Sequence, residues 1–385
     1  MRVGLITTSY PRFVGDPAGN FVEGHARALH ALGYDVDIIA AADPGAARRE
    51  PSAAGAVHRI RAAADLFYAG GAPDALERNA PRTALAAAAF SARLAAAVAS
   101  RSRRQRWDAI IAHWLAPSAL AALAAPRHLP LVAIAHGGDI YTLRRTRLLA
   151  PTLHALRLRA ARLAFVSADL LAATRAAITS PALHAYLDTA VVQPMGIDLS
   201  GYDLLHRAPA TTPPRIAIVA RLAPIKGVDI ALAALAHLPT PVHLVIAGDG
   251  PELPALRVLA AAVPQRHRVT FLGTIDTRRR DDLLRHASLV VVPSRPLPGG
   301  RTEGTPLIAL EALAAGVPVV ASATGGLCAL APAAVLVPPG HPALLAAAID
   351  HALRRPATPA TLRAAVAHLD WPQVAHVLAP TQLPA

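Results

Sequence analysis

Short apolar runs of strand length alternate with longer helical stretches along nearly the whole chain, and this alternation limits the possible folds more than any other feature. Runs of strand character fall at 3–8, 35–41, 109–114, 131–137, 163–168 and 190–194, and again at 215–220, 242–248, 268–273, 288–294, 318–322 and 334–339. Strands that alternate with helices predict parallel sheets covered by helices on both faces. The expected fold class is therefore α/β.

A polar, proline-bearing stretch at 199–214 interrupts the alternation. The chain has 385 residues, which is too long for one ordinary core and suits two domains. We therefore expect two doubly wound, Rossmann-like domains, with the boundary near 198/199. Ligands of such sheets bind at the carboxyl ends of the strands, so we expect a site in the cleft where the two domains face each other.

The stretch 21–33 has the pattern of an early helix. Asn20 precedes it and Glu23 follows three residues later, which resembles a capping box, and Gly33 is a typical stop. The first apolar run of the chain is too short for a signal peptide and reads as a strand.

The chain contains one lysine, Lys226, among 38 basic residues. Lys226 and Arg221 lie in the loop that follows the strand-like run 215–220. An arginine fork and a compact lysine charge together suit a diphosphate, although two exposed loop cations would give the same pattern. The next run ends in AGDGPE at 247–252, where Asp249-Gly250 signals a turn. No G-x-G-x-x-G fingerprint is present, so a nicotinamide cofactor has no support.

The stretch 293–322 carries the strongest chemical signal. A glycine-rich loop leads to a helix expected to begin near Gly304–Thr305, whose free N–H groups would form an anion site. Glu303 stands at that entrance, and helical rise would place Glu311 roughly 12 Å farther on. Carboxylates accept hydrogen bonds from sugar hydroxyls, so each could hold one end of a sugar nucleotide. The alternative is that Glu303 only favours the helix N-terminus and Glu311 is a surface residue.

Three of these pieces, RLAPIKG, AGDGPE and RTEGTPLIALEALAAGVPVVAS, resemble glycosyltransferase family 4, the retaining GT-B glycosyltransferases. The resemblance is strong over 215–345 and weaker over the first half. It implies the GT-B fold of two Rossmann-like domains. It also implies that Glu303 and Glu311 form the E-x7-E motif, the first contacting the donor sugar and the second the ribose.

The resemblance implies further donor contacts. Arg221 and Lys226 would bind the donor diphosphate and stabilise it as it leaves. The loop at 271–275 would lie beside the base. The complete set of implied donor-binding positions in this half of the chain is Arg221, Lys226, Gly248, Gly250, Leu272, Gly304, Thr305, Pro306, Leu307 and Glu311.

The first half agrees with this resemblance. Residues 9–29 resemble the family's glycine-containing first loop, in which Gly15 and Gly19 would face donor and acceptor. Residues 134–141 resemble its H-G-x-D element, which implies that His136 lies near the reaction centre, with Asp139 close by as a donor-binding residue. A loop histidine bonded to backbone is the alternative for His136. Residues 194–203 and 370–378 resemble the crossover and the closing helix, which implies domains 1–198 with 372–385, and 199–371.

The sequence departs from the family in two places. An acidic residue often follows the last GG of the family, and 324–330 has none. The loop 295–300 before Glu303 is also slightly long, which would alter the donor pocket.

The resemblance implies a retaining transfer of a sugar from a nucleotide-diphosphate sugar to a hydroxyl of a glycan, lipid-linked or polysaccharide precursor. His136, Arg221, Lys226 and Glu303 would be the catalytic residues, and neither a metal nor another cofactor is expected. Two alternatives remain open at this stage. One is a sugar-nucleotide epimerase of the same two-domain plan, and the other is a non-catalytic nucleotide-sugar-binding protein.

The net charge of +13 comes with basic clusters at 101–106, 144–147 and 157–162. Nucleic acid is disfavoured as a partner, because no aromatic side chains interleave these clusters. One cysteine excludes an internal disulfide. The apolar stretch 83–99 is interrupted by Arg93, so we expect a cytoplasmic protein. The segment 82–106 could lie on the anionic inner face of a membrane, or be an ordinary packed helix.

Overall fold

The computed structural model describes residues 1–43, 47–63, 66–68, 80–202, 208, 211–331 and 333–380. The chain divides into two compact units. Unit 1 comprises Met1–Gly196 and Trp371–Ala385, and unit 2 comprises Ile197–Asp370. These boundaries fall at 196 and 370, where the sequence suggested 198 and 371.

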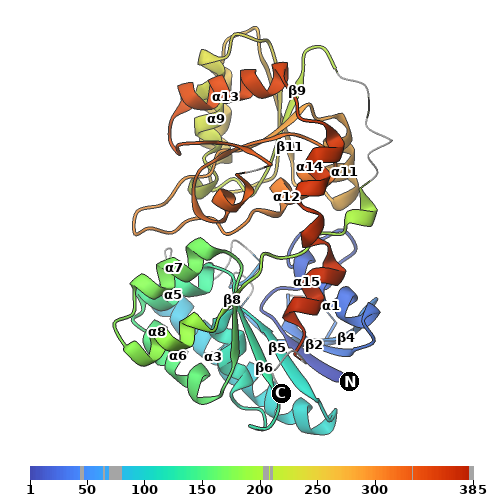
Figure 1. The fold of residues 1–385 in the computed structure, drawn as a ribbon, viewed down its shortest axis with the longest axis vertical. Helices are drawn as coiled ribbons and strands as arrows, with labels where there is room; N and C mark the ends of the chain where they lie inside the picture. The colour runs from blue at the N-terminus through green and yellow to red at the C-terminus, as the bar shows by residue number, and fades with distance from the viewer. Residues whose placement is uncertain are drawn as a thin grey trace. The chain divides into compact units, whose positions relative to one another are not determined.

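Unit 1 is built on an eight-stranded sheet, coloured blue to green in Figure 1, with the order β3-β4-β2-β1-β5-β6-β7-β8. Its strands pair in parallel except β3 with β4, which is antiparallel. The strands are β1 (Arg2–Ile6), β2 (Asp35–Ala41), β3 (Arg49–Ser52), β4 (Gly55–Ile60), β5 (Ala109–His113), β6 (Leu131–Ala135), β7 (Arg162–Phe165) and β8 (Val191–Val192). The order reverses between β1 and β5, so a crevice is expected beyond the carboxyl ends of these two strands.

The helices of unit 1 connect these strands. They are α1 (Asn20–Ala31), α3 (Ala80–Arg104), α4 (Leu120–Ala122), α5 (Gly138–Arg145), α6 (Leu149–Leu158), α7 (Ala168–Ala176), α8 (Pro181–Asp188) and α15 (Trp371–Leu378). Helix α15, from the end of the chain, packs beside α1 (Figure 1).

Unit 2 contains a six-stranded sheet of parallel pairs with the order β11-β10-β9-β12-β13-β14. Its strands are β9 (Arg215–Val219), β10 (His243–Ala247), β11 (Arg268–Gly273), β12 (Leu289–Val292), β13 (Val319–Ser322) and β14 (Val335–Val337). Its helices are α9 (Val228–Ala234), α10 (Leu253–Ala261), α11 (Thr277–His286), α12 (Leu307–Ala314), α13 (Pro342–Arg354) and α14 (Pro359–Ala365). The predicted α/β class with two parallel sheets is confirmed.

The inner strands of unit 2, β9, β10, β12 and β13, are almost entirely apolar because both faces of the sheet are covered. In β9, Ala217 packs into one core with α11, α12 and α14, whereas Ile216 and Ile218 pack into the other with α9, α10 and α13. Successive side chains of a strand point to opposite faces, so a doubly covered strand needs apolar residues at every position. The same rule accounts for the near-continuous apolar runs seen in the sequence.

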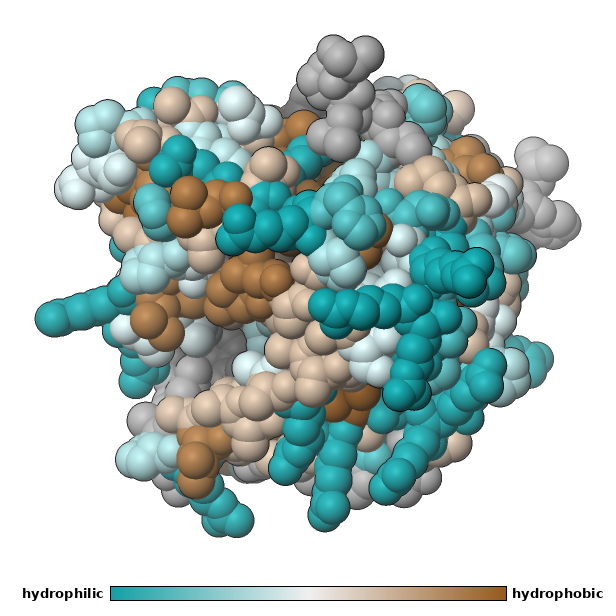
Figure 2. Space-filling model, turned by 90° about the horizontal axis from the view of Figure 1, so that it is seen from below, coloured by the Kyte–Doolittle hydropathy of each residue, from teal (hydrophilic) through white to brown (hydrophobic). Residues whose placement is uncertain are grey.

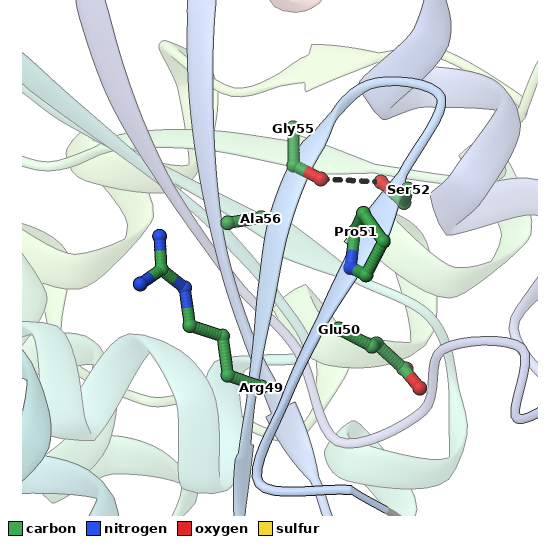
Figure 3. A pocket seen from close by; sticks show the side chains of 6 residues that line it. All are labelled: Arg49, Glu50, Pro51, Ser52, Gly55 and Ala56. Atoms are coloured by element: carbon green, nitrogen blue, oxygen red, sulfur yellow. Dashed lines mark hydrogen bonds between the residues drawn. The ribbon is translucent and has the colours of Figure 1, made fainter.

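The hairpin of β3 and β4 has no counterpart among the predicted strands. β3 reads REPS, with two charges and a proline, and a strand of that composition is tolerated because it is the edge of the sheet. A hollow of about 420 Å³ lies at this hairpin, and Ser52 donates to the Gly55 carbonyl oxygen at 2.9 Å. Figure 3 shows Arg49 and Glu50 pointing to opposite sides of the hairpin. Glu50 is already paired with the buried guanidinium of Arg59, so the hollow offers no unused charge from this residue.

Helix α1 begins differently from the prediction. Its N-cap is Gly19 in a left-handed conformation, with φ of 75°, and no side chain caps the helix. Glu23 pairs with Arg27 one turn farther on, at 2.8 Å, and does not reach back as a capping box requires. The capping-box prediction is therefore wrong, although the helix itself is present.

A glycine inside α1 allows α15 to pack closely. A β-carbon at Gly24 would lie 2.3 Å from Nε1 of Trp371, so this position accepts no side chain while the indole stays in place. The neighbouring His25 stacks on the same indole, with ring centroids 5.8 Å apart. The indole therefore fixes the packing of α1 against α15.

Within the described ranges, one helix, α3, has a segment (Pro81–Arg104) long and apolar enough to cross a membrane. Core helices of globular proteins also meet this criterion. Phe90, Leu94 and Val98 form a buried stripe along α3, which packs against α4 and β4. These three side chains of α3 therefore contribute to the core of unit 1, whereas Leu85 is exposed.

Candidate active site

Two loops of unit 2 meet beside the point where the strand order reverses. β9 has β10 on one side and β12 on the other, so the loops after β9 and β12 flank this reversal. The first carries Lys226, in the turn Pro224–Lys226, and the second carries Glu303. Lys226 Nζ lies 2.5 Å from Glu303 Oε2, and both side chains are largely buried. The structure thus brings together two predicted site residues that are far apart in sequence.

Arg295 ties the same two loops together through the backbone. Its N–H donates to the Ile225 carbonyl at 2.9 Å, and its Nε donates to the Pro224 carbonyl at 2.9 Å. Its guanidinium also pairs with Asp229 at the start of α9. These bonds fix the turn that presents Lys226, so Arg295 is a positioning residue that the sequence patterns did not identify.

The glycine pair after β13 holds the backbone at Glu303. Gly326 N–H donates to the Glu303 carbonyl at 3.1 Å. Gly325 has φ of 55°, and a β-carbon there would lie 2.0 Å from the same carbonyl oxygen. The GG element, which departs from the family in the residue that follows it, therefore supports the loop of Glu303.

Helix α12 begins later than predicted. It starts at Leu307, with Pro306 as an extended N-cap, whereas the sequence suggested Gly304–Thr305. A proline disfavours helical backbone in the residue before it, which excludes Thr305 from the helix. Gly304 and Thr305 are therefore loop residues. Glu303 also lies outside the helix, so the roughly 12 Å separation from Glu311 derived from helical rise does not apply.

Glu311 is buried inside unit 2 and is not a surface residue. It is 8% exposed, and its Oε1 accepts a bond of 2.6 Å from Arg280 Nη1 on α11. Arg280 also donates Nε and Nη2 to Asp281, at 3.0 and 2.8 Å. Burial raises the pKa of the Glu311 carboxyl, the Arg280 charge lowers it, and Asp281 raises it again, with a net increase. No sequence pattern had indicated Arg280.

Further predicted donor-binding residues of unit 2 also lie at the carboxyl ends of strands. Arg221 is half-buried directly after β9, and its carbonyl accepts the Ala223 N–H at 2.9 Å. A β-carbon at Gly248 would lie 1.8 Å from the Ala220 carbonyl oxygen, and one at Gly250 would lie 2.3 Å from the Leu222 carbonyl oxygen. These glycines allow the loops after β9 and β10 to touch. Leu272, near the end of β11, is 43% exposed.

In unit 1, Asp139 serves as a backbone clamp. Its carboxylate is 5% exposed and accepts four backbone N–H groups at 2.7 to 3.1 Å, from Leu115, His136, Gly137 and Ile140. Burial raises the pKa of this carboxyl, and the four donors partly offset the increase. We therefore assign Asp139 a positioning role, joining the loops after β5 and β6. The donor contact of Asp139 stays a prediction.

His136 follows β6 and is half-buried among aromatic rings. Its ring centroid lies 5.1 Å from that of Phe21 and 4.7 Å from that of Trp114. Its Nε2 lies 2.9 Å from Nδ1 of His113, the last residue of β5. The alternative of a loop histidine bonded to backbone does not hold, because the partner is a second imidazole.

Gly19, the other predicted donor-binding residue of unit 1, packs against the loop after β1. A β-carbon at this position would lie 2.5 Å from the Ser9 carbonyl oxygen. Gly15 lies in the same loop, with φ of 85°. Both glycines therefore lie in the loop that follows β1, one of the two strands between which the strand order of unit 1 reverses.

Comparison with protein families connects these features to one class of enzyme. Residues 18–200 match the family model described as glycosyltransferase family 4, and residues 206–368 match the one described as glycosyl transferases group 1. A glycogen synthase of Mycobacterium tuberculosis is 30% identical over 344 residues, which covers 85% of this chain and 79% of that protein. The chain belongs to glycosyltransferase family 4. The resemblance drawn from the motifs is thereby confirmed.

Other relatives match shorter segments. A D-inositol 3-phosphate glycosyltransferase of Xylanimonas cellulosilytica is 36% identical over 158 residues, which covers 37% of this chain and 36% of that protein. Among solved structures, sucrose-phosphate synthase from Thermosynechococcus elongatus has a TM-score of 0.68 at 22% identity, covering 98% of this chain and 97% of its own. Anabaena HepE, crystallised with UDP-glucose, has a TM-score of 0.69 at 20% identity, covering 99% of both chains. These two structures share the fold of this glycosyltransferase.

Proposed function

We propose that this glycosyltransferase transfers a sugar, with retention of anomeric configuration, from a nucleotide-diphosphate sugar to a hydroxyl of a glycan, lipid-linked or polysaccharide precursor. The ion pair of Lys226 with Glu303 at the switch point of unit 2 carries this proposal. A cation beside a carboxylate matches the two ends of a sugar diphosphate, since the ammonium attracts phosphate oxygens and the carboxylate accepts sugar hydroxyls.

In this proposal donor binding separates the pair. The diphosphate replaces Glu303 as the partner of Lys226, and a hydroxyl of the donor sugar becomes the partner of Glu303. Arg221 adds a planar fork at the end of the same strand. Both cations then oppose the negative charge that grows on the diphosphate as the glycosidic bond breaks, which is where stabilisation lowers the barrier most.

The acceptor hydroxyl would attack from the face that the diphosphate leaves, and a departing phosphate oxygen would take its proton. This route needs no protein nucleophile, and we propose that it needs no metal. Glu311, held by Arg280, would accept hydrogen bonds from the ribose. Gly304, Thr305, Pro306 and Leu307 would line the phosphates from the backbone.

Thermal shift with UDP-, GDP- and ADP-sugars tests donor binding directly. A ligand at 100 times its Kd adds about 2.7 kcal/mol of stability, which raises the Tm of a domain of this size by roughly 5–10 °C. Lys226→Ala should abolish most of the shift for the cognate donor. Arg355→Ala, which removes an exposed cation of unit 2, is the matched control and should keep it. Equal shifts in both variants would remove Lys226 from the site.

Retention is tested separately, by NMR determination of the anomeric configuration of the product made from the cognate donor. An inverted product would contradict the proposed mechanism while leaving donor binding intact. Conversion of the donor to an isomeric sugar nucleotide without an acceptor would favour the epimerase alternative.

We also propose that unit 1 associates peripherally with anionic membranes from the cytoplasmic side. Arg82, Arg93 and Arg104 recur at intervals of eleven residues, close to three helical turns, and so follow one exposed face of α3. Figure 2 shows extended hydrophilic side chains projecting from one face of the molecule. Sedimentation with phosphatidylserine vesicles at low salt should capture the protein, and R93E/R104E should reduce the capture. Equal capture of wild type and variant would refute the role of α3.

A further inference from the structure

Three histidines of unit 1 form a continuous chain of imidazoles. Nδ1 of His25, on α1, lies 3.0 Å from Nε2 of His113, and Nδ1 of His113 lies 2.9 Å from Nε2 of His136. The chain runs from α1, in the interior of unit 1, to the loop after β6, and His136 is the one of the three that the sequence analysis predicted as a site residue. The mechanism above gives no task to any of the three rings.

The inner rings are isolated from water. His25 and His113 are both 0% exposed, and the ring of Phe21 covers His113 at 6.1 Å. Burial lowers the pKa of His25 to about 3, and burial together with the neighbouring imidazoles lowers that of His113 well below its usual value. Burial lowers the pKa of His136 as well. All three rings are therefore neutral near pH 7.

A neutral imidazole has one N–H donor and one acceptor nitrogen, so the chain has only two consistent directions. In the first, His25 donates to His113 and His113 donates to His136. In the second, every bond is reversed, and His25 then carries a proton on Nε2. Nε2 of His25 is buried and has no hydrogen-bonding partner among the described residues. A buried N–H without an acceptor is rarer in proteins than an acceptor without a donor, so the first direction is favoured.

We propose that His25 and His113 are positioning residues that fix His136 as the Nδ1–H tautomer. In this state Nε2 of His136 accepts from His113, and Nδ1–H is the group that remains for a substrate. His136 makes no hydrogen bond through Nδ1 to the described part of the chain. The inference rests on the proposed function and on the place near the reaction centre that the resemblance implies for His136. It adds that His136 acts there as a fixed hydrogen-bond donor to a sugar oxygen, and not as a base.

NMR of protein labelled with ¹⁵N-histidine measures the tautomers without any substrate. Signals are assigned by comparison with single histidine variants. We expect a protonated Nδ1 and an unprotonated Nε2 on each of the three rings. A protonated Nε2 on His136 would overturn the inference, and so would an imidazolium.

Donor affinity provides the functional readout. His25→Phe keeps an aromatic ring against Trp371 but removes the donor to His113, so His113 can reverse its bond to His136. We expect a mixed tautomer at His136 and a roughly two- to tenfold increase in the Kd of the cognate donor, the effect of one hydrogen bond. His30→Gln, an exposed histidine of the same helix, is the control and should change neither.

The outcomes separate this inference from the proposed function. If the wild type binds no sugar nucleotide, the proposed function fails, whatever the tautomers are. If the wild type binds donor and His25→Phe binds it equally well, the positioning role fails and the proposed function stands. Because the NMR measurement uses the wild-type protein, the tautomer assignment can be tested even if a variant does not fold.

Discussion

Removing Arg280 should leave Glu311 as a buried carboxylate without its cation. In Arg280→Met the aliphatic stem is largely kept, but the bond of 2.6 Å to Glu311 is lost. Burial and Asp281, the two influences that raise the pKa of Glu311, both remain. The carboxyl group therefore takes up a proton at pH values where the wild-type residue is ionised.

The free energy needed to keep Glu311 protonated sets the loss of folding stability in the variant. A carboxyl whose pKa is 4.5 in the unfolded chain needs about 1.4 kcal/mol per pH unit above that value to stay protonated. At pH 7.5 this amounts to at most about 4 kcal/mol. The difference from wild type is smaller than this limit, because the pKa of Glu311 is already raised in the wild type. The pKa in the folded variant is raised, so the unfolded chain releases the proton first. The stability of the Arg280→Met variant relative to wild type therefore falls as the pH rises from about 4.5 toward the raised pKa of Glu311.

The assay is urea unfolding of the full chain at pH 5 and pH 7.5, followed by far-UV circular dichroism. The three tryptophans, Trp107, Trp114 and Trp371, all lie in unit 1, so their fluorescence follows that unit and serves as an internal control. We expect a deficit that grows from pH 5 to pH 7.5, where it should reach about 1–4 kcal/mol, and the double variant R280M/E311Q should lose this pH dependence. An equal deficit at both pH values, or one below about 1 kcal/mol at pH 7.5, would refute the reasoning.

Three further variants test other features. Burial lowers the pKa of His25 to about 3, so below pH 6.5 the unfolded chain binds a proton that the folded chain does not, and the wild type loses stability as the pH falls from 8 to 5. In His25→Phe this loss of stability should be smaller by about 2 kcal/mol, as measured by urea unfolding followed by tryptophan fluorescence. Asp139→Asn places an amide before four backbone donors and should destabilise unit 1 by about 2–4 kcal/mol in the same assay; a loss below 1 kcal/mol would contradict the clamp. Gly325→Ala should destabilise unit 2 by about 1–3 kcal/mol and weaken donor binding. Gly340→Ala is the control, because Gly340 also has a positive φ but no atom lies within 4 Å of the added carbon. This variant should lose only the stability that corresponds to the backbone strain.

The pattern of apolar runs was sufficient to predict the parallel sheets, because doubly covered strands must be apolar at every position. The β3–β4 hairpin was missed for the opposite reason, since an edge strand such as REPS has no apolar signal. Helix α12 starts later than the sequence pattern suggests, because Pro306 disfavours helical backbone at Thr305. These are local errors, and none of them affects the sheets.

The site itself depended on contacts that no local pattern contains. Lys226 meets Glu303 across 77 positions, and His25 meets His113 across 88. The motifs identified Lys226, Glu303 and Glu311 as chemically important, but the residues that hold them in place were not visible. Arg280, Arg295 and His113 have ordinary sequence surroundings, and only packing shows what they contact.

The single lysine now has a physical explanation. Arg280 binds Asp281 through two of its nitrogens and Glu311 through a third, so its planar fork suits a partner that never leaves. Lys226 pairs with Glu303 through one compact ammonium on a flexible stem. In the proposed function this cation must release a carboxylate oxygen and take a phosphate oxygen in the same place. A point charge makes that exchange with a small movement, whereas a guanidinium would have to break and realign several directional bonds.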